Sequence, residues 1–544
     1  MNPLASTKCA VRLLMAMAAI ASALFISSCG SSSSLAKPNN QGYSNSNLSG
    51  TYVFSSTGID STNGLFLAIA GTFTTGNGGN GQITGGMIDI NGFSLTSAIS
   101  TSITSGTYTV NPDGRGTATL QFSGGSTTLD FVLAGGPTSG ASTHGLVTEF
   151  DGNGTGSGTL DLQNAGALQG SYAFGLVGAS DTNDTPLAMA GEFASGGSIS
   201  GLADINSDGG LLGSPALTLS GSVTAGSPGT ASLTTSVGTY HFDVYMIDDT
   251  HLKFIETDSA PIMAGDAFSQ QTSISNGIYA YAMDGLDNNG YPLALAGFFT
   301  AGSGSSISAG LEDYNDSGTG TVNQVGFGGS YTGFSGGRTQ ITLTGGFFNG
   351  NSAVQTATFA AYPSTGGIEL LEIDGAGITT GFALPQGSTT TLATSQGYGL
   401  NISAFNSGSG GGAYEEDDIA QFDVNSTGSN YNGVEDINDE GSTTSSTFNG
   451  TLTTSSEVPG YGAAGSTSGE INFNYYLANN GATALILETD QIQSGTGVFE
   501  LQNSTQNSIL SSTQNAGQSR AAGAHFSIAP LRHGKHSAGK KTSR

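Results

Sequence analysis

Two short motifs recur four times along this chain of 544 residues, always in the same order, and both carry carboxylates. The first motif reads Gly-x-x-Asp-x-Asn and the second reads Glu-x-Asp. In each copy, 52 to 60 residues separate the Asp of the first motif from the Glu of the second. A repeat of this length is too long for one solenoid turn or one propeller blade, and it fits one small domain. The chain is therefore predicted to contain four copies of one acidic β-domain.

Short apolar segments separated by turn signals fill each copy, which is the pattern of an antiparallel all-β domain. An aromatic residue marks the first strand of every copy, at Tyr52, Tyr172, Tyr279 and Tyr398, and we expect these rings in the core. Eight short strands joined in a meander can close into an up-and-down barrel, which leaves no free edge. In the first copy the strands are expected within residues 50–54, 65–73, 82–90, 107–110, 117–122, 129–133, 146–150 and 159–162.

The predicted fold class is all-β, with four tandem antiparallel eight-stranded meander domains standing in a row. We expect up-and-down barrels, and β-sandwiches are the alternative. The Gly-x-Tyr-x-Phe start at residues 50–54 and the strand number resemble lipocalin and avidin barrels in layout. The Trp that those families place near the start is missing here, so the resemblance carries no ligand chemistry to this chain. The predicted domains span residues 48–165, 168–271, 275–387 and 394–503.

The N-terminal segment has the organisation of a secretory signal. Lys8 and Arg12 precede an apolar run over residues 13–26, which is too short for a membrane-spanning helix. The run ends in Ile-Ser-Ser-Cys-Gly, with the cysteine at Cys29, and this ending resembles the bacterial lipobox. The resemblance implies cleavage before Cys29, lipidation of that residue, and a place in the outer membrane or at the cell surface, since Gly30 follows the cysteine. Residues 30–47 are predicted to be a flexible Ser/Asn-rich tether.

Charge is distributed unevenly along the chain. All 40 Asp and Glu residues lie between Asp60 and Glu500, together with three basic residues, Arg115, Lys253 and Arg338. The tail over residues 504–544 contains six basic residues and no acidic one, and it is predicted to be a disordered end. Because the acidic body repels nucleic acid, the sequence predicts no nucleic-acid partner and favours cations or basic partners.

The two motifs are expected at the same end of each domain, because an even number of strands separates them in a meander. Clustered carboxylates and an Asn carbonyl are the hard oxygen ligands that Ca²⁺ prefers. The segment Asp204-x-Asn206-x-Asp208-Gly209 resembles the opening of an EF-hand-type loop, although the closing Glu is absent. The competing interpretation is turn chemistry, in which Asx side chains cap strand ends. The candidate metal ligands are Asp89, Asn91, Glu149, Asp151, Asp204, Asn206, Asp208, Glu256, Asp258, Asp313, Asn315, Glu372, Asp374, Asp436, Asn438, Glu488 and Asp490.

Catalytic constellations are sparse in the sequence. The three His residues of the body do not recur in all copies, and four equal copies argue against a single active site. The sequence therefore predicts a non-enzymatic binding, adhesion or structural role at the cell envelope, with a membrane contact through Cys29 and a surface or extracellular ligand. A lipocalin-like carrier of small apolar molecules and a secreted hydrolase with paired carboxylates are the alternatives.

Overall fold

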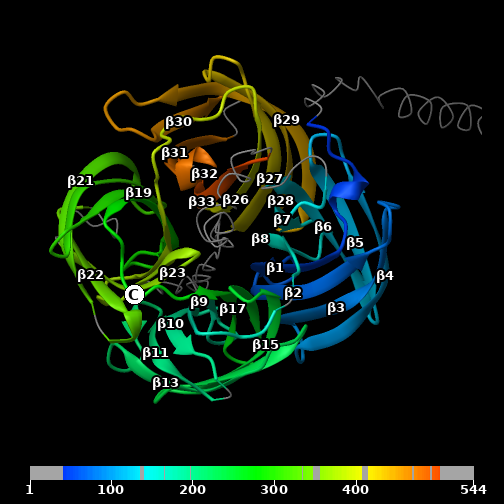
Figure 1. The fold of residues 1–544 in the computed structure, drawn as a ribbon, viewed down its shortest axis with the longest axis horizontal. Coiled ribbons are helices and arrows are strands. Elements are labelled where there is room, and N and C mark those ends of the chain that lie inside the picture. The colour runs from blue at the N-terminus through cyan, green and yellow to red at the C-terminus, as the bar shows by residue number, and fades with distance from the viewer. Residues whose placement is uncertain are drawn as a thin grey trace, which may run out of the picture. The chain divides into compact units, whose positions relative to one another are not determined.

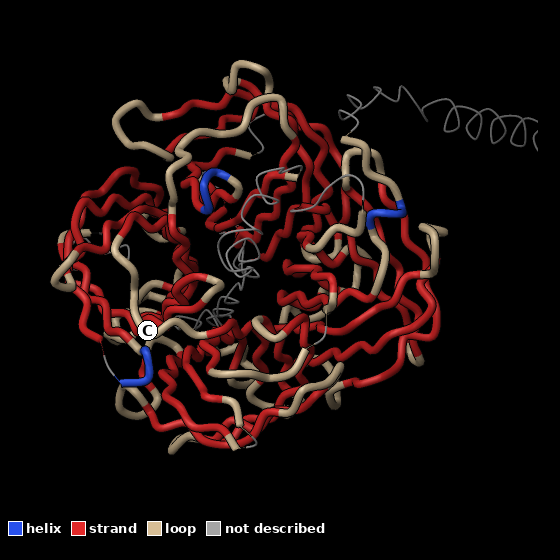
Figure 2. The backbone as a smooth tube through the Cα atoms, viewed as in Figure 1, coloured by secondary structure: helices blue, strands red, loops and turns tan. Residues whose placement is uncertain are grey.

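The computed structural model describes residues 41–134, 140–164, 166–196, 198–333, 335–346, 356–406, 414–467, 471–489 and 493–502. Strands make up most of these residues, and the only helices in them are the three-residue 3-10 helices η1 (Asn45–Asn47), η2 (Ser335–Gly337) and η3 (Asn479–Gly481) (Figure 2). Within the same ranges no helix has the length and apolar character needed to cross a membrane.

The first eight strands form barrel 1, drawn in blue to cyan in Figure 1. Each strand pairs antiparallel with the next, and β1 closes the barrel by pairing with β8. The strands are β1 (Thr51–Asp60), β2 (Phe66–Thr75), β3 (Gln82–Gly92), β4 (Ile99–Val110), β5 (Arg115–Phe122), β6 (Gly125–Ala134), β7 (His144–Glu149) and β8 (Gly154–Leu162).

Barrel 2 repeats this order and closes through the pairing of its first and last strands, β9 and β17. Its eight strands are β9 (Ser171–Ala179), β10 (Pro186–Ala194), β11 (Ile199–Ser207), β13 (Leu217–Val223), β14 (Gly229–Thr234), β15 (Thr239–Asp248), β16 (His251–Glu256) and β17 (Ile262–Ser269). A two-residue strand, β12 (Gly210–Leu211), pairs with the end of β11.

Barrels 3 and 4 are closed in the same way, by β18 with β25 and by β26 with β33. Barrel 3 contains β18 (Gly277–Leu286), β19 (Pro292–Gly302), β20 (Ser306–Asp316), β21 (Gly320–Gly333), β22 (Thr339–Thr344), β23 (Thr356–Ser364), β24 (Gly367–Glu372) and β25 (Ile378–Pro385). Barrel 4 contains β26 (Gly397–Asn406), β27 (Tyr414–Val424), β28 (Asn430–Asp439), β29 (Ser442–Thr454), β30 (Tyr461–Ser466), β31 (Asn472–Ala478), β32 (Thr483–Glu488) and β33 (Gln493–Leu501). The prediction of four eight-stranded antiparallel barrels is confirmed, and the sandwich alternative is wrong.

Aromatic pairs on the first two strands fill each barrel, because residues directly opposite each other in an antiparallel pair point to the same face. In barrel 1, Tyr52 lies opposite Phe73, and their ring centroids are 5.9 Å apart. The repeated aromatic residues are therefore core residues, as expected. The equivalent pairs are Tyr172 with Phe193 at 5.4 Å, Tyr279 with Phe299 at 5.4 Å, and Tyr398 with Phe422 at 5.5 Å.

The first two strands of each barrel are buried on both faces, in contrast to outer strands such as β4, which alternates between buried and exposed residues. Their outer faces pack on the last three strands of the next barrel: β1 and β2 contact β15, β16 and β17. The same contact recurs from barrel 2 to barrel 3 and from barrel 3 to barrel 4. It recurs again from barrel 4 to barrel 1, where β26 and β27 contact β6, β7 and β8. The barrels thus form a closed cycle of contacts, which corrects the expectation of a row.

Residues 41–47, which the sequence assigned to the tether, pack on barrel 1. Gln41 donates its backbone N–H to the Pro112 carbonyl, and the Tyr43 hydroxyl donates to the Gln502 carbonyl at 2.9 Å. Tyr43 and Asn47 are both buried. The ordered chain therefore begins earlier than its Ser/Asn-rich composition indicates, because one aromatic side chain fixes the segment.

Candidate functional site: the joints between barrels

The two repeated motifs lie at the same end of each barrel, as strand parity predicted. In barrel 1 the first motif ends β3 and the second begins at the end of β7. Both border the β1–β2 turn: Ser61 donates its N–H to the Asn153 carbonyl, and Asn63 donates to the Ser94 hydroxyl. The motifs stand four strands apart around the barrel, however, so each one faces a different neighbouring barrel. We call the contact between two neighbouring barrels a joint.

The Asn of the first motif joins one barrel to the second motif of the next. Asn91 Nδ2 donates to the carbonyls of Glu256 and Asp258, at 2.6 and 2.8 Å. We call this pair of bonds the Asn latch. It occurs at all four joints, including the one from barrel 4 back to barrel 1. The other latches run from Asn206 to Glu372 and Gly377 (2.9 and 3.0 Å), from Asn315 to Glu488 and Gln493 (2.9 and 2.6 Å), and from Asn438 to Glu149 and Gly154 (2.6 and 2.8 Å).

The Asp of the first motif accepts hydrogen bonds from the fifth and sixth strands of the next barrel. Asp204 accepts two bonds from Arg338, at 2.6 and 3.0 Å, and one from the Tyr362 hydroxyl at 2.6 Å. At the other joints the donors to this Asp are Tyr245 for Asp89 (2.5 Å), Asn474 for Asp313 (2.6 Å), and Arg115 for Asp436 (3.0 Å). Both residues of the first motif therefore contact the next barrel.

All three basic residues between Asp60 and Glu500 lie at joints. Arg338 and Arg115 occupy equivalent places at the start of the fifth strand, and Arg338 is only 1% exposed. Lys253 is fully buried and donates from Nζ to Thr159 of barrel 1 at 2.5 Å and to Asp266 at 3.1 Å. Buried cations of this kind destabilise a fold strongly if their partners are removed. The few Lys and Arg side chains of the acidic body are therefore placed at the joints.

The carboxylates of the second motif have two roles. The Asp caps backbone N–H groups: Asp151 accepts from Thr128 and Asn153, both at 3.0 Å, and Asp374 accepts from Thr358 and Ala376, both at 2.9 Å. This geometry supports the turn interpretation for these residues. The Glu is buried at the joint, and burial, followed by the charge of Asp258, raises the pKa of Glu256 well above its usual range. Asp490 lies outside the described residues.

The candidate metal ligands do not come together as a ligand cluster. Asp208 is exposed, while Asp204 and Asn206 of the same motif are buried against barrel 3. Over the part of the chain that the structure describes, no three His, Cys, Asp or Glu side chains are arranged so that they could hold a metal ion. Calcium binding by the motifs stays a prediction, and it would have to compete with the joint contacts.

A buried chain of charges crosses the barrels and does not follow the repeat. His144 contacts Asp161 at 2.7 Å within barrel 1 and Glu500 of barrel 4 at 3.3 Å. Asp161 lies 3.5 Å from Lys253 Nζ, and Lys253 contacts Asp266. Burial alone would lower the pKa of His144, but the Glu500 and Asp161 carboxylates outweigh burial and raise it to about 9.

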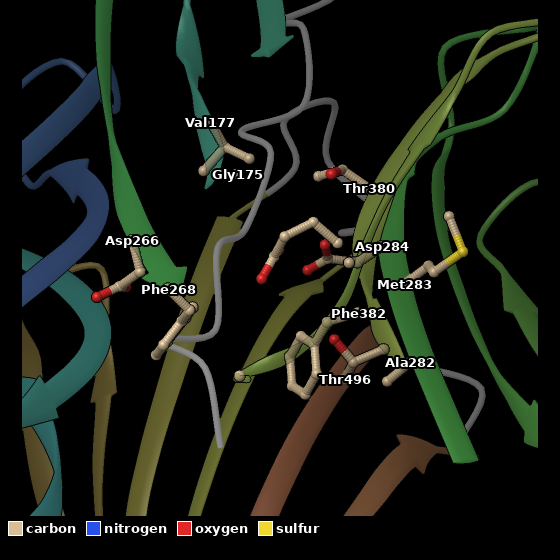
Figure 3. A pocket seen from close by; sticks show the side chains of 13 residues that line it. Gly175, Val177, Asp266, Phe268, Ala282, Met283, Asp284, Thr380, Phe382 and Thr496 are labelled. Atoms are coloured by element: carbon tan, nitrogen blue, oxygen red, sulfur yellow. The ribbon is translucent and has the colours of Figure 1, made fainter. Parts of the chain in front are cut away.

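This charge chain continues to barrel 3 beside a small cavity of about 20 Å³ (Figure 3). Asp266 of barrel 2, Glu369 of barrel 3 and Thr496 of barrel 4 all line it. Burial, followed by the charge of Asp266, raises the pKa of Glu369 to about 8. The cavity has room for about one water molecule, which is too little for an organic substrate. Sequence reasoning missed this cluster because its residues recur in no motif.

The barrel interiors are packed with side chains, as the four core clusters show. Barrel 3 contains a cavity of about 20 Å³ lined by Tyr281 and Glu312 among apolar residues. The Tyr281 hydroxyl donates to Glu312 Oε2 at 2.7 Å, and burial raises the pKa of Glu312 well above its usual range. This cavity also has room for about one water molecule.

Comparison with known proteins adds no family to this description. No protein-family model matches the chain, and no curated protein matches it.

Proposed function

We propose that this protein is a non-enzymatic component of a bacterial cell envelope, held to a membrane by a lipid on Cys29. In this proposal it presents four mutually braced β-barrels as a binding, adhesion or structural module. The observation that carries the proposal is the Asn latch, because the residues repeated in all four copies contact neighbouring barrels and not an open cleft. The signal segment and Cys29 lie outside the described residues, so the anchor rests on the sequence pattern alone.

Two features weigh against the alternative functions. A carrier of small apolar molecules needs an internal cavity of several hundred Å³, whereas the described cavity in barrel 3 measures about 20 Å³. A hydrolase with paired carboxylates needs space for substrate between them, and the cavity of about 20 Å³ leaves none between Asp266 and Glu369. A larger cavity of about 270 Å³ is lined by Asp208 and Asp287 at the joint between barrels 2 and 3, and no His among the described residues lines it. A divalent cation remains a candidate ligand of the acidic rim, and the external partner is proposed only as a surface or extracellular ligand.

Replacement of the two cysteines in turn tests the anchor. We expect Cys29→Ser to abolish metabolic incorporation of labelled palmitate and to move the protein from the membrane fraction to the soluble fraction. Cys9→Ser is the matched control, because Cys9 lies inside the signal segment and should not affect either readout. Protease treatment of intact cells then separates surface display from a periplasmic location. Unchanged palmitate labelling in Cys29→Ser would refute the lipid anchor.

A further inference from the structure

The joint between barrel 4 and barrel 1, here called the closing joint, differs chemically from the other three. In barrels 1, 2 and 3 an Ala lies five residues before the core Phe of the second strand, at Ala68, Ala188 and Ala294, and it packs in an apolar joint cluster. In barrel 4 the residue at this position is Asp417. Two residues earlier, Glu415 stands where barrel 1 has Phe66 and barrels 2 and 3 have proline. Both acidic side chains are fully buried.

The facing surface of barrel 1 is also more polar than the equivalent surface of barrel 2. Barrel 2 presents Ile262 and Ala264 to β2 of barrel 1, and these residues belong to the apolar cluster of that joint. The equivalent residues of barrel 1 are Thr155 and Ser157. Their hydroxyls donate to the two carboxylate oxygens of Asp417, each at 2.6 Å. An apolar layer has thus been replaced on both sides by a carboxylate and its hydrogen-bond donors.

Four carboxyl groups lie near Asp417, those of Glu149, Glu415, Glu416 and Asp418, whereas β8 and β26 present hydroxyl groups to it. The basic residues of this joint lie elsewhere. Arg115 pairs with Asp436, and His144 pairs with Glu500. Burial is the largest cause that raises the pKa of Asp417, to about 6, and of Glu415 well above its usual range. Carboxylates around this joint raise the pKa of Asp417, Glu415, Glu149 or Asp418 through their negative charge. They are Asp60, Asp151, Asp184, Asp284, Glu416, Glu435 and Asp439.

The closing joint is also the joint without a peptide connection. Short linkers over residues 163–170, 270–276 and 386–396 connect consecutive barrels, so those neighbours stay close even when their joint loosens. Within the described residues, barrels 4 and 1 meet through non-covalent contacts alone. We propose that the closing joint is an acid-closed clasp, which holds barrel 4 on barrel 1 while Asp417 and Glu415 are protonated and opens as they ionise. This inference does not depend on the membrane anchor or on the external ligand.

The expected shift is large enough to measure. The pKa of Asp417 is about two units higher in the closed joint, so its ionisation weakens closure up to about 100-fold between pH 3 and alkaline pH, and about 10-fold of this falls between pH 5 and pH 8.5. Glu415 adds to this effect. Closure should therefore be strongest below about pH 4, and the closed state should lose population from pH 5 towards pH 8.5. Because the folded-state pKa is raised, the contribution to closure is complete below the ordinary pKa and is lost as the pH rises through the raised value.

Distance measurement by electron spin resonance between two spin labels tests the clasp in the full chain with Cys9 and Cys29 replaced by serine. One label pair, Asn153→Cys with Ser442→Cys, spans the closing joint at exposed positions. The matched control pair, Ala376→Cys with Gly210→Cys, occupies the equivalent positions of the joint between barrels 2 and 3. We expect the first distance to lengthen and broaden from pH 5 to pH 8.5, while the control distance stays constant.

Charge removal gives the decisive comparison. The variant with Asp417→Asn and Glu415→Gln should keep the short distance at both pH values, whereas Glu457→Gln, an exposed carboxylate elsewhere in barrel 4, should behave as the parent. Small-angle X-ray scattering of label-free protein supplies a second readout, a radius of gyration that rises with pH in the parent and not in the double variant. Constant distances in the parent, equal lengthening at both joints, or lengthening in the double variant would each overturn the clasp.

Discussion

Loss of one Asn latch should cost a measurable part of the free energy of unfolding. Asn206 is fully buried, and its Nδ2 donates to the carbonyls of Glu372 and Gly377. Asn206→Ala removes both donors and leaves two buried carbonyl oxygens without them. Each buried acceptor left unpaired costs about 1–3 kcal/mol. Burying alanine costs less desolvation free energy than burying the Asn amide, and this difference offsets part of the loss. We therefore expect a loss of about 2–4 kcal/mol.

Urea denaturation followed by tyrosine fluorescence measures this loss, since the chain contains 18 Tyr and no Trp. The matched control is Asn153→Ala, at an exposed turn position, which should change the free energy of unfolding by about 0.5 kcal/mol or less. Asn206→Asp is a sharper probe, because at pH 7 a carboxylate would face the two carbonyls. We expect it to be worse than alanine at pH 7 and to recover near pH 4, where the acid can donate one bond. Equal stability of Asn206→Ala and Asn153→Ala would refute the latch.

Three further outcomes follow from the joints. Arg338→Met should lower the free energy of unfolding by about 3–5 kcal/mol, because it leaves Asp204 buried without its cation, and Asp204→Asn in the same chain should restore part of the loss in a denaturant titration. Burial raises the folded-state pKa of Glu369 to about 8 and of Glu192 to about 7, so their contribution to stability is complete below about pH 4.5 and is lost as the pH rises through 7 to 8. Scanning calorimetry should accordingly give a higher melting temperature at pH 5.5 than at pH 8.5, and the reverse order would contradict this. Calcium titration calorimetry tests the cation interpretation of the motifs: several bound ions with a raised melting temperature would support it, and the absence of saturable heat would leave the motif side chains as joint contacts alone.

The barrels themselves could be predicted from sequence because each one is encoded locally. Tyr52 and its partner Phe73 lie within 25 residues of each other, together with the alternating residues of β1 and the turn that follows it. The same arrangement recurs in all four copies. Repetition supported the same strand number and spacing in every copy, but it left the β-sandwich as an alternative until the pairing of first and last strands was seen.

The joints could not be predicted in the same way, because their partners are far apart in the chain. Asn91 and the carbonyl of Glu256 are separated by 165 residues, and the bond uses the backbone of the Glu and not its side chain. The sequence contains a weaker signal of the joints: both motifs occur the same number of times. In addition, Arg115 begins the fifth strand of barrel 1, and Arg338 directly precedes the fifth strand of barrel 3. The charge chain through His144 and Lys253 left no such signal, since it breaks the repeat.

The closure of the cycle follows from the way the joints are built. Each joint sets the first strands of one barrel against the last strands of the next, which is a head-to-tail interface with two different faces. Such an interface either continues without end or closes on itself, and here Asn438 of the fourth barrel reaches the second motif of the first. Closure leaves no unpaired copy of either face. The four copies therefore keep the same latch residues, while the substitutions that distinguish them, such as Asp417 and Glu415, can concentrate at the one joint that no linker holds.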